Sequence, residues 1–178
     1  MMRSILRRTA VLALAATALA TPAFADHHGA KPNIVGVAAG NADFSTLVTA
    51  VKAAGLVDTL SGAGPFTVFA PTNAAFGKLP AGAVETLVKP ENKGLLTTIL
   101  TYHVVAGKVT AKDVVALINQ GGGKAMIKTV QGGTLTASLQ GQNVVLTDAK
   151  GGKSIVTQTD VMQSNGVVHV IDTVVMPG

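Results

Sequence analysis

The chain has no cysteine, no tryptophan and only one tyrosine among its 178 residues. The absence of cysteine excludes a disulfide scaffold, a thiol nucleophile and a cysteine-based zinc site. Aromatic residues make up 3% of the chain, so a stacking platform for single-stranded nucleic acid is not expected. Charged residues make up 13% and hydrophobic residues 48%, a composition that can bury a core and that excludes a disordered protein.

The first 25 residues have the pattern of an export signal. Three arginines lie within the first eight residues, residues 11–20 are almost entirely apolar, and Ala23-Phe24-Ala25 is a small-x-small cleavage site. We therefore predict a cleaved signal peptide over 1–25, a short flexible tail over 26–32 and one domain over 33–178. No later run reaches about 18 apolar residues, so we expect no transmembrane segment in the mature chain.

Removing the signal changes the charge of the protein. All three arginines lie in it, which leaves 11 lysines against 9 acidic residues and a net charge of about +2. That balance is not typical of a nucleic-acid-binding protein, so no nucleic-acid partner is expected. The signal predicts an exported protein that is periplasmic or extracellular, including the cell surface.

The new N-terminus gives a first testable prediction. Cleavage after Ala25 would expose Asp26-His27-His28, whose amine, two backbone amides and third-position imidazole can surround Cu(II) or Ni(II) in a square plane. Adding one equivalent of Cu(II) to the processed protein should therefore produce a visible absorption band. The hypothesis fails if no band forms, or if the mature N-terminus lies elsewhere.

Helices are expected in the first half of the domain and strands in the second. Apolar residues at helical spacing, capping residues and alternation favour this division. The class is therefore α+β with mostly antiparallel pairing. Helices are predicted at 43–54, 83–88, 95–101 and 110–118, and strands at 66–70, 102–105, 125–130, 134–139, 143–147, 154–157 and 166–176.

Three segments together carry a family resemblance. Gly64–Phe76, Leu100–Lys108 and Ser164–Pro177, in that order, resemble the first conserved box, the Tyr-His segment and the second box of fasciclin (FAS1) domains. The resemblance covers about 33–177. It implies a wedge-shaped β-sandwich with helices packed on one side. It also implies secreted or surface-anchored proteins of cell adhesion and matrix contact, with no cofactor and no enzymatic activity.

The box residues are interpreted mainly as determinants of the fold. Pro71 ends its strand, and Thr72 or Asn73 caps the turn that follows. His169 lies among valines on a strand, so a buried neutral imidazole bonded to the backbone is expected. The motif residues given this structural role are Phe69, Pro71, Thr72, Asn73, Phe76, Asn165, Gly166, His169 and Asp172.

The resemblance also points to two candidate binding segments. One is Tyr102, His103 and Val104, and the other is Asp160-Val161, at places linked to integrin contact in animal relatives. The structural alternative makes Tyr102 a core aromatic and Asp160 a turn or helix-capping residue.

Two functions of different class follow. The first is a secreted or periplasmic, monomeric module that binds a cell-surface or matrix protein or polysaccharide without turnover. The alternative is a periplasmic small-ligand carrier or enzyme that uses His103 and His169. A deep pocket with converging titratable groups would favour the carrier or enzyme. A closed core with an exposed apolar patch would favour the binding module. No Gly-x-Ser-x-Gly motif or cofactor fingerprint is present, and a metal site at His103 and His169 would need a carboxylate brought close by the fold. A third option is an envelope protein of purely structural role.

Overall fold

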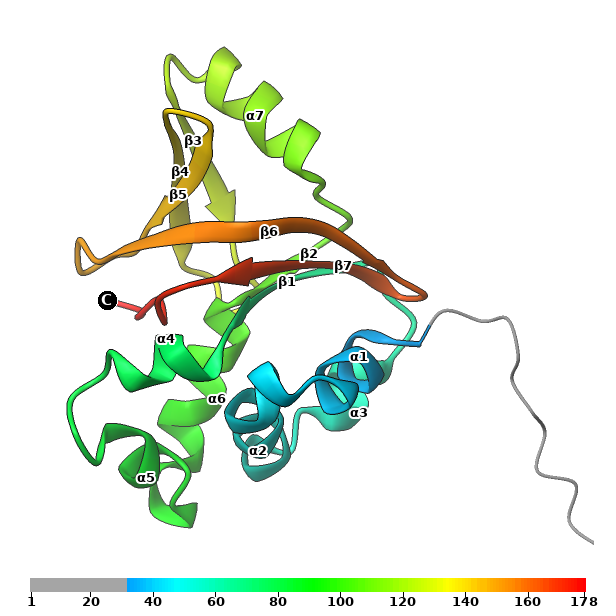
Figure 1. Cartoon of the computed structure of the whole chain (residues 1–178), viewed down its shortest axis with the longest axis vertical. Helices are drawn as coiled ribbons and strands as arrows, with labels where there is room; N and C mark the ends of the chain where they lie inside the picture. Colours follow the sequence, from blue (N-terminus) through cyan, green and yellow to red (C-terminus); the bar gives the residue numbers. More distant parts are fainter. Residues whose placement is uncertain (1–31) are drawn as a thin grey trace, which may run out of the picture.

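The computed structural model describes residues 32–178. The predicted signal peptide, and the tail up to residue 31 with its Asp26-His27-His28 sequence, lie outside the described residues. The first half of the described chain is mostly helical, and Figure 1 shows its helices grouped below the long strands. The helical segments are α1 (Ile34–Gly40), η1 (Ala42–Phe44), α2 (Ser45–Ala54), α3 (Val57–Ser61), α4 (Asn73–Gly77), α5 (Ala83–Leu87), η2 (Pro90–Asn92), α6 (Lys93–Tyr102) and α7 (Ala111–Gln120).

The strands form a sheet in the order β2-β1-β7-β6-β5-β4-β3. Neighbouring strands pair antiparallel except β1 and β7, which run parallel, so the predicted α+β class with mostly antiparallel pairing is confirmed. The Val130 N–H donates to the Val104 carbonyl at 2.8 Å, which brings the two ends of the sheet towards a barrel. The strands are β1 (Phe66–Pro71), β2 (Val104–Ala106), β3 (Lys124–Lys128), β4 (Thr134–Gln140), β5 (Asn143–Thr147), β6 (Lys153–Gln163) and β7 (Gly166–Ile171).

The neighbouring strands β1 and β7 separate two hydrophobic cores. Val68 and Val168 point to a core shared with α1–α6, whereas Phe69 and Ile171 point to a second core shared with α7 and β3–β6. Every residue of β7 is buried, as expected for a strand that is apolar on both faces. Figure 1 shows β3–β5 rising away from β6 and β7, with α7 beside them and the other helices on the opposite side. The wedge-like arrangement expected from the family resemblance is confirmed.

Several sequence-based boundaries are corrected by the structure. Tyr102 ends helix α6 and His103 follows it, so the strand predicted at 102–105 is reduced to β2. Asn41 caps the start of the second helical region, which opens as the 3₁₀ turn η1 one residue before the predicted start at 43. The strand predicted to reach Met176 ends at Ile171. The Thr110 capping box of α7 and the left-handed Gly55 after α2 agree with the sequence.

Candidate functional site

The two histidines of the described domain flank the buried strand residue Phe69. The Phe69 N–H donates to the His103 carbonyl at 2.9 Å, and the Phe69 ring stacks on the His169 ring with centroids 5.5 Å apart. Phe69 and His169 are register partners in the parallel β1–β7 pair. Residues that are far apart in the sequence therefore form one cluster around the β1–β7 pair.

His103 is buried, and both of its ring nitrogens are occupied. The Val175 N–H donates to Nε2 at 3.2 Å, so Nε2 is the acceptor and Nδ1 carries the proton, which it donates to the Ile99 carbonyl at 2.8 Å. Burial lowers the pKa of His103 from its ordinary 6.5 to about 4, although the Ile99 bond and the charge of Asp148 oppose this. The imidazole is therefore neutral at pH 7 and joins the end of α6 to the C-terminal segment.

His169 has the opposite tautomer. Its Nδ1 accepts a long bond of 3.4 Å from the Asp160 N–H, and its Nε2 donates to the Val109 carbonyl at 2.9 Å. The ring therefore joins β7 to the irregular part of β6 and to the loop before α7. The expectation of a buried imidazole bonded to the backbone is confirmed, and neither histidine leaves a ring nitrogen free for proton transfer.

Asp160 lies at a β-bulge with an unusual backbone conformation. Its φ of 57° is in the left-handed region, where a residue other than glycine is uncommon, and the β6–β7 register shifts at this point. One carboxylate oxygen accepts from the Ala111 N–H, the first residue of α7, at 2.8 Å. Asp160 thus carries out the turn and capping role of the structural alternative, while Val161 beside it is half-buried against the helical core.

The Tyr102–Val104 segment does not form an accessible surface. Tyr102, His103 and Val104 are 1%, 2% and 4% exposed, so their side chains cannot meet a partner while the domain is folded. The Tyr102 hydroxyl donates to the Thr134 carbonyl at 2.8 Å and accepts from the Ala149 N–H at 3.2 Å. The prediction of a contact surface at these three residues is wrong: they lie in the core. The tyrosine there joins α6 to β4 and to the β5–β6 turn.

This geometry predicts the cost of removing one hydroxyl. Tyr102→Phe keeps the ring but leaves the Thr134 carbonyl and the Ala149 N–H without their partner, so the free energy of unfolding should fall by about 1–3 kcal/mol. Urea unfolding of the wild type and the variant measures the difference. An unchanged unfolding free energy would contradict the structural role assigned to the hydroxyl.

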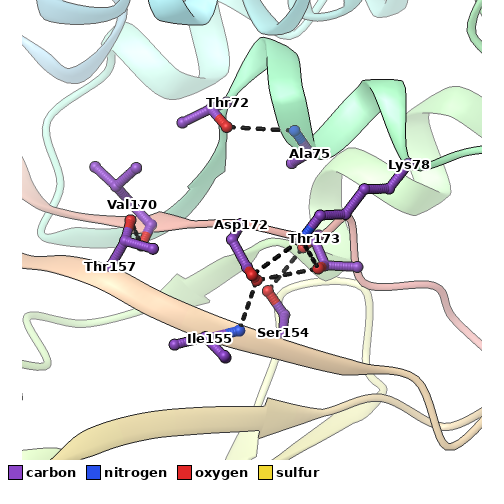
Figure 2. Close-up of polar contacts among 9 residues, drawn as sticks. All are labelled: Thr72, Ala75, Lys78, Ser154, Ile155, Thr157, Val170, Asp172 and Thr173. Atoms are coloured by element: carbon purple, nitrogen blue, oxygen red, sulfur yellow. Dashed lines mark hydrogen bonds and ion pairs between the residues drawn. The ribbon is translucent and has the colours of Figure 1, made fainter.

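The first box anchors the start of helix α2. Thr72 is the N-cap of α4 and accepts from the Ala75 N–H at 3.3 Å (Figure 2), which settles the choice between Thr72 and Asn73. The Asn73 amide instead accepts from the Thr46 N–H at 3.0 Å and donates to the Ala42 carbonyl at 2.8 Å. Phe76 is buried in the helical core. The motif residues of this box therefore fix the helices against β1.

The second box closes the other end of the same core. The Asn165 amide donates to the Leu60 carbonyl at 2.8 Å and accepts from the Ile34 N–H at 3.0 Å, which joins the β6–β7 turn to α3 and α1. Gly166 lies so close to Phe66 that a Cβ would overlap the Phe66 carbonyl oxygen. These contacts give both residues a structural role.

Asp172 ends the box with a small polar cluster. Figure 2 shows its carboxylate facing Lys78, Thr173 and the backbone of Ile155. The Ile155 N–H donates at 2.8 Å and the Lys78 ammonium at 3.0 Å. Burial alone would raise the pKa of Asp172, but the hydrogen bonds from Ile155, Lys78 and Thr173 outweigh it, and the pKa lies below its ordinary value. Asp172 is therefore ionised at neutral pH and fastens α4 to β6.

Sequence reasoning missed Asp148 as a fold residue. One of its oxygens accepts from the Gly152 N–H at 2.7 Å and the other from the Met176 N–H at 2.9 Å. The available signal was an aspartate followed by Gly151-Gly152, a pattern typical of a turn in which the carboxylate bonds its own backbone. Asp148 and His103 together hold the C-terminal segment.

The interior offers little room for a ligand. An apolar cavity of about 30 Å³ between α1, α2, β1 and α6 is bordered by Leu47, Phe69 and His103, and it is about the size of one water molecule. Within residues 32–178, no group of three His, Asp or Glu side chains is placed to hold a metal ion. Every buried side-chain nitrogen and oxygen in that range has a hydrogen-bond partner.

Comparison with known proteins agrees with this architecture. A profile of the fasciclin domain matches residues 42–177. The chain belongs to the fasciclin domain family. Protein sll1483 of Synechocystis is 54% identical over 144 residues, which cover 81% of this chain and 73% of that protein. The cell surface glycolipoprotein MPB83 of Mycobacterium bovis is 37% identical over 156 residues, which cover 83% of this chain and 62% of MPB83.

The fasciclin fold is also seen in a solved structure. The FAS1 domain pair of the insect cell adhesion molecule fasciclin I superposes with a TM-score of 0.71 at 22% identity, covering 81% of this chain. The present chain spans about half the length of that domain pair. No single helix within residues 32–178 is long and apolar enough to cross a membrane, and the bent pair Ile34–Gly40 and Ala42–Ala54 passes that test only by combined length and composition.

Proposed function

We propose that this fasciclin domain is an exported recognition module that binds a protein or polysaccharide at the cell surface or in the matrix, without catalysis. The observation that carries the proposal is the state of the two histidines. All four ring nitrogens are engaged with backbone groups, and three of the four bonds are 3.2 Å or shorter. The ring nitrogens of His103 and His169 thus stabilise the fold, and function is left to the outer surface of the domain.

The relatives support the same class of function. MPB83 is named a cell surface protein, and the domain pair of similar fold comes from a cell adhesion molecule. The export signal predicted over 1–25 would deliver this chain to such a location. The alternative of a small-ligand carrier is disfavoured because the cavity beside His103 is about 30 Å³, far below the several hundred Å³ of ordinary ligand pockets.

Binding to whole cells tests the proposal. The protein, purified after export and labelled, should bind intact cells or envelope fractions of the organism that produces it. This binding should be saturable, and unlabelled protein should compete. Asp160→Asn keeps an oxygen that can accept from Ala111, so it changes the charge at this bulge while it preserves the cap. A loss of cell binding in this folded variant would place the Asp160-Val161 segment in the contact surface. Absence of saturable binding to any surface would refute the recognition role.

A further inference from the structure

The outer face of strands β3–β6 has an unusual composition. Side chains that alternate inward on β3, such as Ala125 and Ile127, lie in the second core with α7, while Lys124, Met126 and Lys128 point outward. Cross-strand partners lie on the same face of a sheet, so the register carries this outer face across the other strands. It consists of Lys124, Met126, Lys128, Thr134, Thr136, Ser138, Gln140, Asn143, Val145, Thr147, Lys153 and Ile155, of which Val145 is buried and the others are exposed or half-buried.

All of the charge on this outer face is positive. Lys124, Lys128 and Lys153 are exposed, and β3, β4, β5 and the first six residues of β6 contain no acidic residue. Within residues 32–178, the salt bridge that is present joins Lys78 to Asp172, on another part of the surface. The three lysines therefore stand without an acidic partner from the described chain.

The acidic side chains nearest to this sheet form hydrogen bonds within the fold. Asp148 bonds the backbone of its own turn and of Met176, and Asp160 bonds the start of α7. Asp113 lies in the capping box of α7, where its bonds to Thr110 lower its pKa. These carboxylates keep their charge but are held at the β5–β6 turn and at the start of α7, so lysines are the charged side chains among the strand residues of the outer face.

The register sets the spacing of the charges. Met126, Thr136, Thr147 and Lys153 form one row across four strands, so Lys153 lies about 14 Å from β3 at about 4.8 Å per strand. Lys124 and Lys128 are four residues apart on β3, or about 13 Å along the strand. The face thus carries three separated lysines with threonine and serine hydroxyls between them, and the Met126 side chain is 75% exposed.

We propose that this outer face binds an acidic polysaccharide. Repeated carboxylates or sulfates along an extended polymer would contact the separated lysines, and its hydroxyls would bond those of Thr136, Ser138 and Thr147. Within residues 32–178, the side-chain hydroxyls of these three residues make no hydrogen bond, so they are available to a ligand. The inference rests on the proposed recognition function and names its partner class.

The aromatic content of the face favours an acidic over a neutral glycan. Aromatic rings supply the large rigid areas on which uncharged ligands are held. The aromatic side chains of the described domain lie inside it, with Phe44, Phe69, Phe76 and Tyr102 buried and Phe66 half-buried. Without an exposed ring, most of the affinity at this face would come from charge, and it would weaken as added salt screens the lysines.

Binding to alginate, a linear polyuronate, tests the inference. The protein purified after export should bind calcium-free alginate at low ionic strength, bind neutral dextran far more weakly, and lose alginate affinity as salt rises. The triple variant Lys124→Gln, Lys128→Gln, Lys153→Gln should bind alginate at least about tenfold more weakly. The matched triple Lys52→Gln, Lys89→Gln, Lys93→Gln removes the same charge from exposed positions of the helical half and should change affinity less than about twofold.

A second variant separates this face from net charge. Met126→Glu leaves every lysine in place but puts a carboxylate among the three lysines of the face. It too should weaken alginate binding at least about tenfold. Equal weakening by both lysine triples, or no binding to alginate, would overturn the inference. Binding to anionic phosphatidylglycerol vesicles in place of alginate would assign the face to a membrane surface and overturn it as well. Saturable cell binding without alginate binding would leave the proposed function standing, whereas loss of both would refute both.

Discussion

Gly166→Ala is expected to lower the free energy of unfolding by at least about 3 kcal/mol. Gly166 is the register partner of Phe66 in the parallel pair β1–β7. An added Cβ would overlap the Phe66 carbonyl oxygen and lie 2.8 Å from its carbonyl carbon. Because these are backbone atoms of the neighbouring strand, the ends of β1 and β7 must separate to admit one methyl group. Urea unfolding measures the loss.

A matched glycine provides the control. Gly40 ends α1, and a Cβ there would have no atom within 4 Å. Gly40→Ala should therefore change the unfolding free energy by no more than about 0.5 kcal/mol, or raise it slightly by restricting the unfolded chain. Similar losses in the two variants would show that steric contact with Phe66 is not the reason for glycine at 166.

Protonation of His103 is expected to remove about 3 kcal/mol of stability as the pH falls from about 6.5 to about 4. The pKa is about 4 in the folded protein and about 6.5 in the unfolded chain, so the unfolded state binds the proton more tightly. The contribution is therefore complete above pH 6.5 and is lost progressively on acidification. Urea unfolding at several pH values between 7.5 and 4 follows it.

The control replaces the titrating ring with a neutral amide. His103→Asn can place a donor near the Ile99 carbonyl and an acceptor near the Val175 N–H, but it does not titrate. Carboxylates such as Asp172 titrate alike in both proteins, so their effect cancels in the comparison. The wild type should lose about 3 kcal/mol more than His103→Asn over this range. Parallel pH profiles would contradict the role of His103.

Local signals in the sequence predicted much of the fold. Thr110 and Asp113 form the capping box that the start of α7 requires, and alternation over Thr134–Leu139 marks strand β4. Gly55 ends α2 in the left-handed conformation that glycine adopts without a steric cost. Each of these features depends on residues close together in the chain, which is why the sequence alone was sufficient.

The errors arose where distant contacts decide the local structure. The run Thr101-Tyr102-His103-Val104-Val105 is rich in β-branched and aromatic residues, which favours a strand. The helix nevertheless continues to Tyr102, because the tyrosine ring packs in the second core and its hydroxyl bonds to Thr134 and Ala149. Such tertiary contacts override propensity, and no local pattern reports them.

The candidate site shows the same division. The sequence correctly suggested a buried, backbone-bonded His169, since the strand around it is apolar on both faces. It could not place Asp160 against Ala111, because the two residues are 49 positions apart and meet only through a bulge. The outer lysine face could not be predicted either, because the register of four strands is needed to show that Lys124 and Lys153 share one face of the sheet.

The parallel pairing of β1 with β7 determines how much of the chain must be made before it can fold. The pair joins Phe66 to Gly166, residues 100 positions apart, and the segment beyond it is held by His103 and Asp148. Both cores include residues of β7 and of the segment after it, so neither can close until residues 166–175 have been made. Contacts of such long range form slowly. A nascent chain would therefore stay unfolded until β7 and the segment after it have been made, and an unfolded chain is the form that the ordinary export route carries across a membrane.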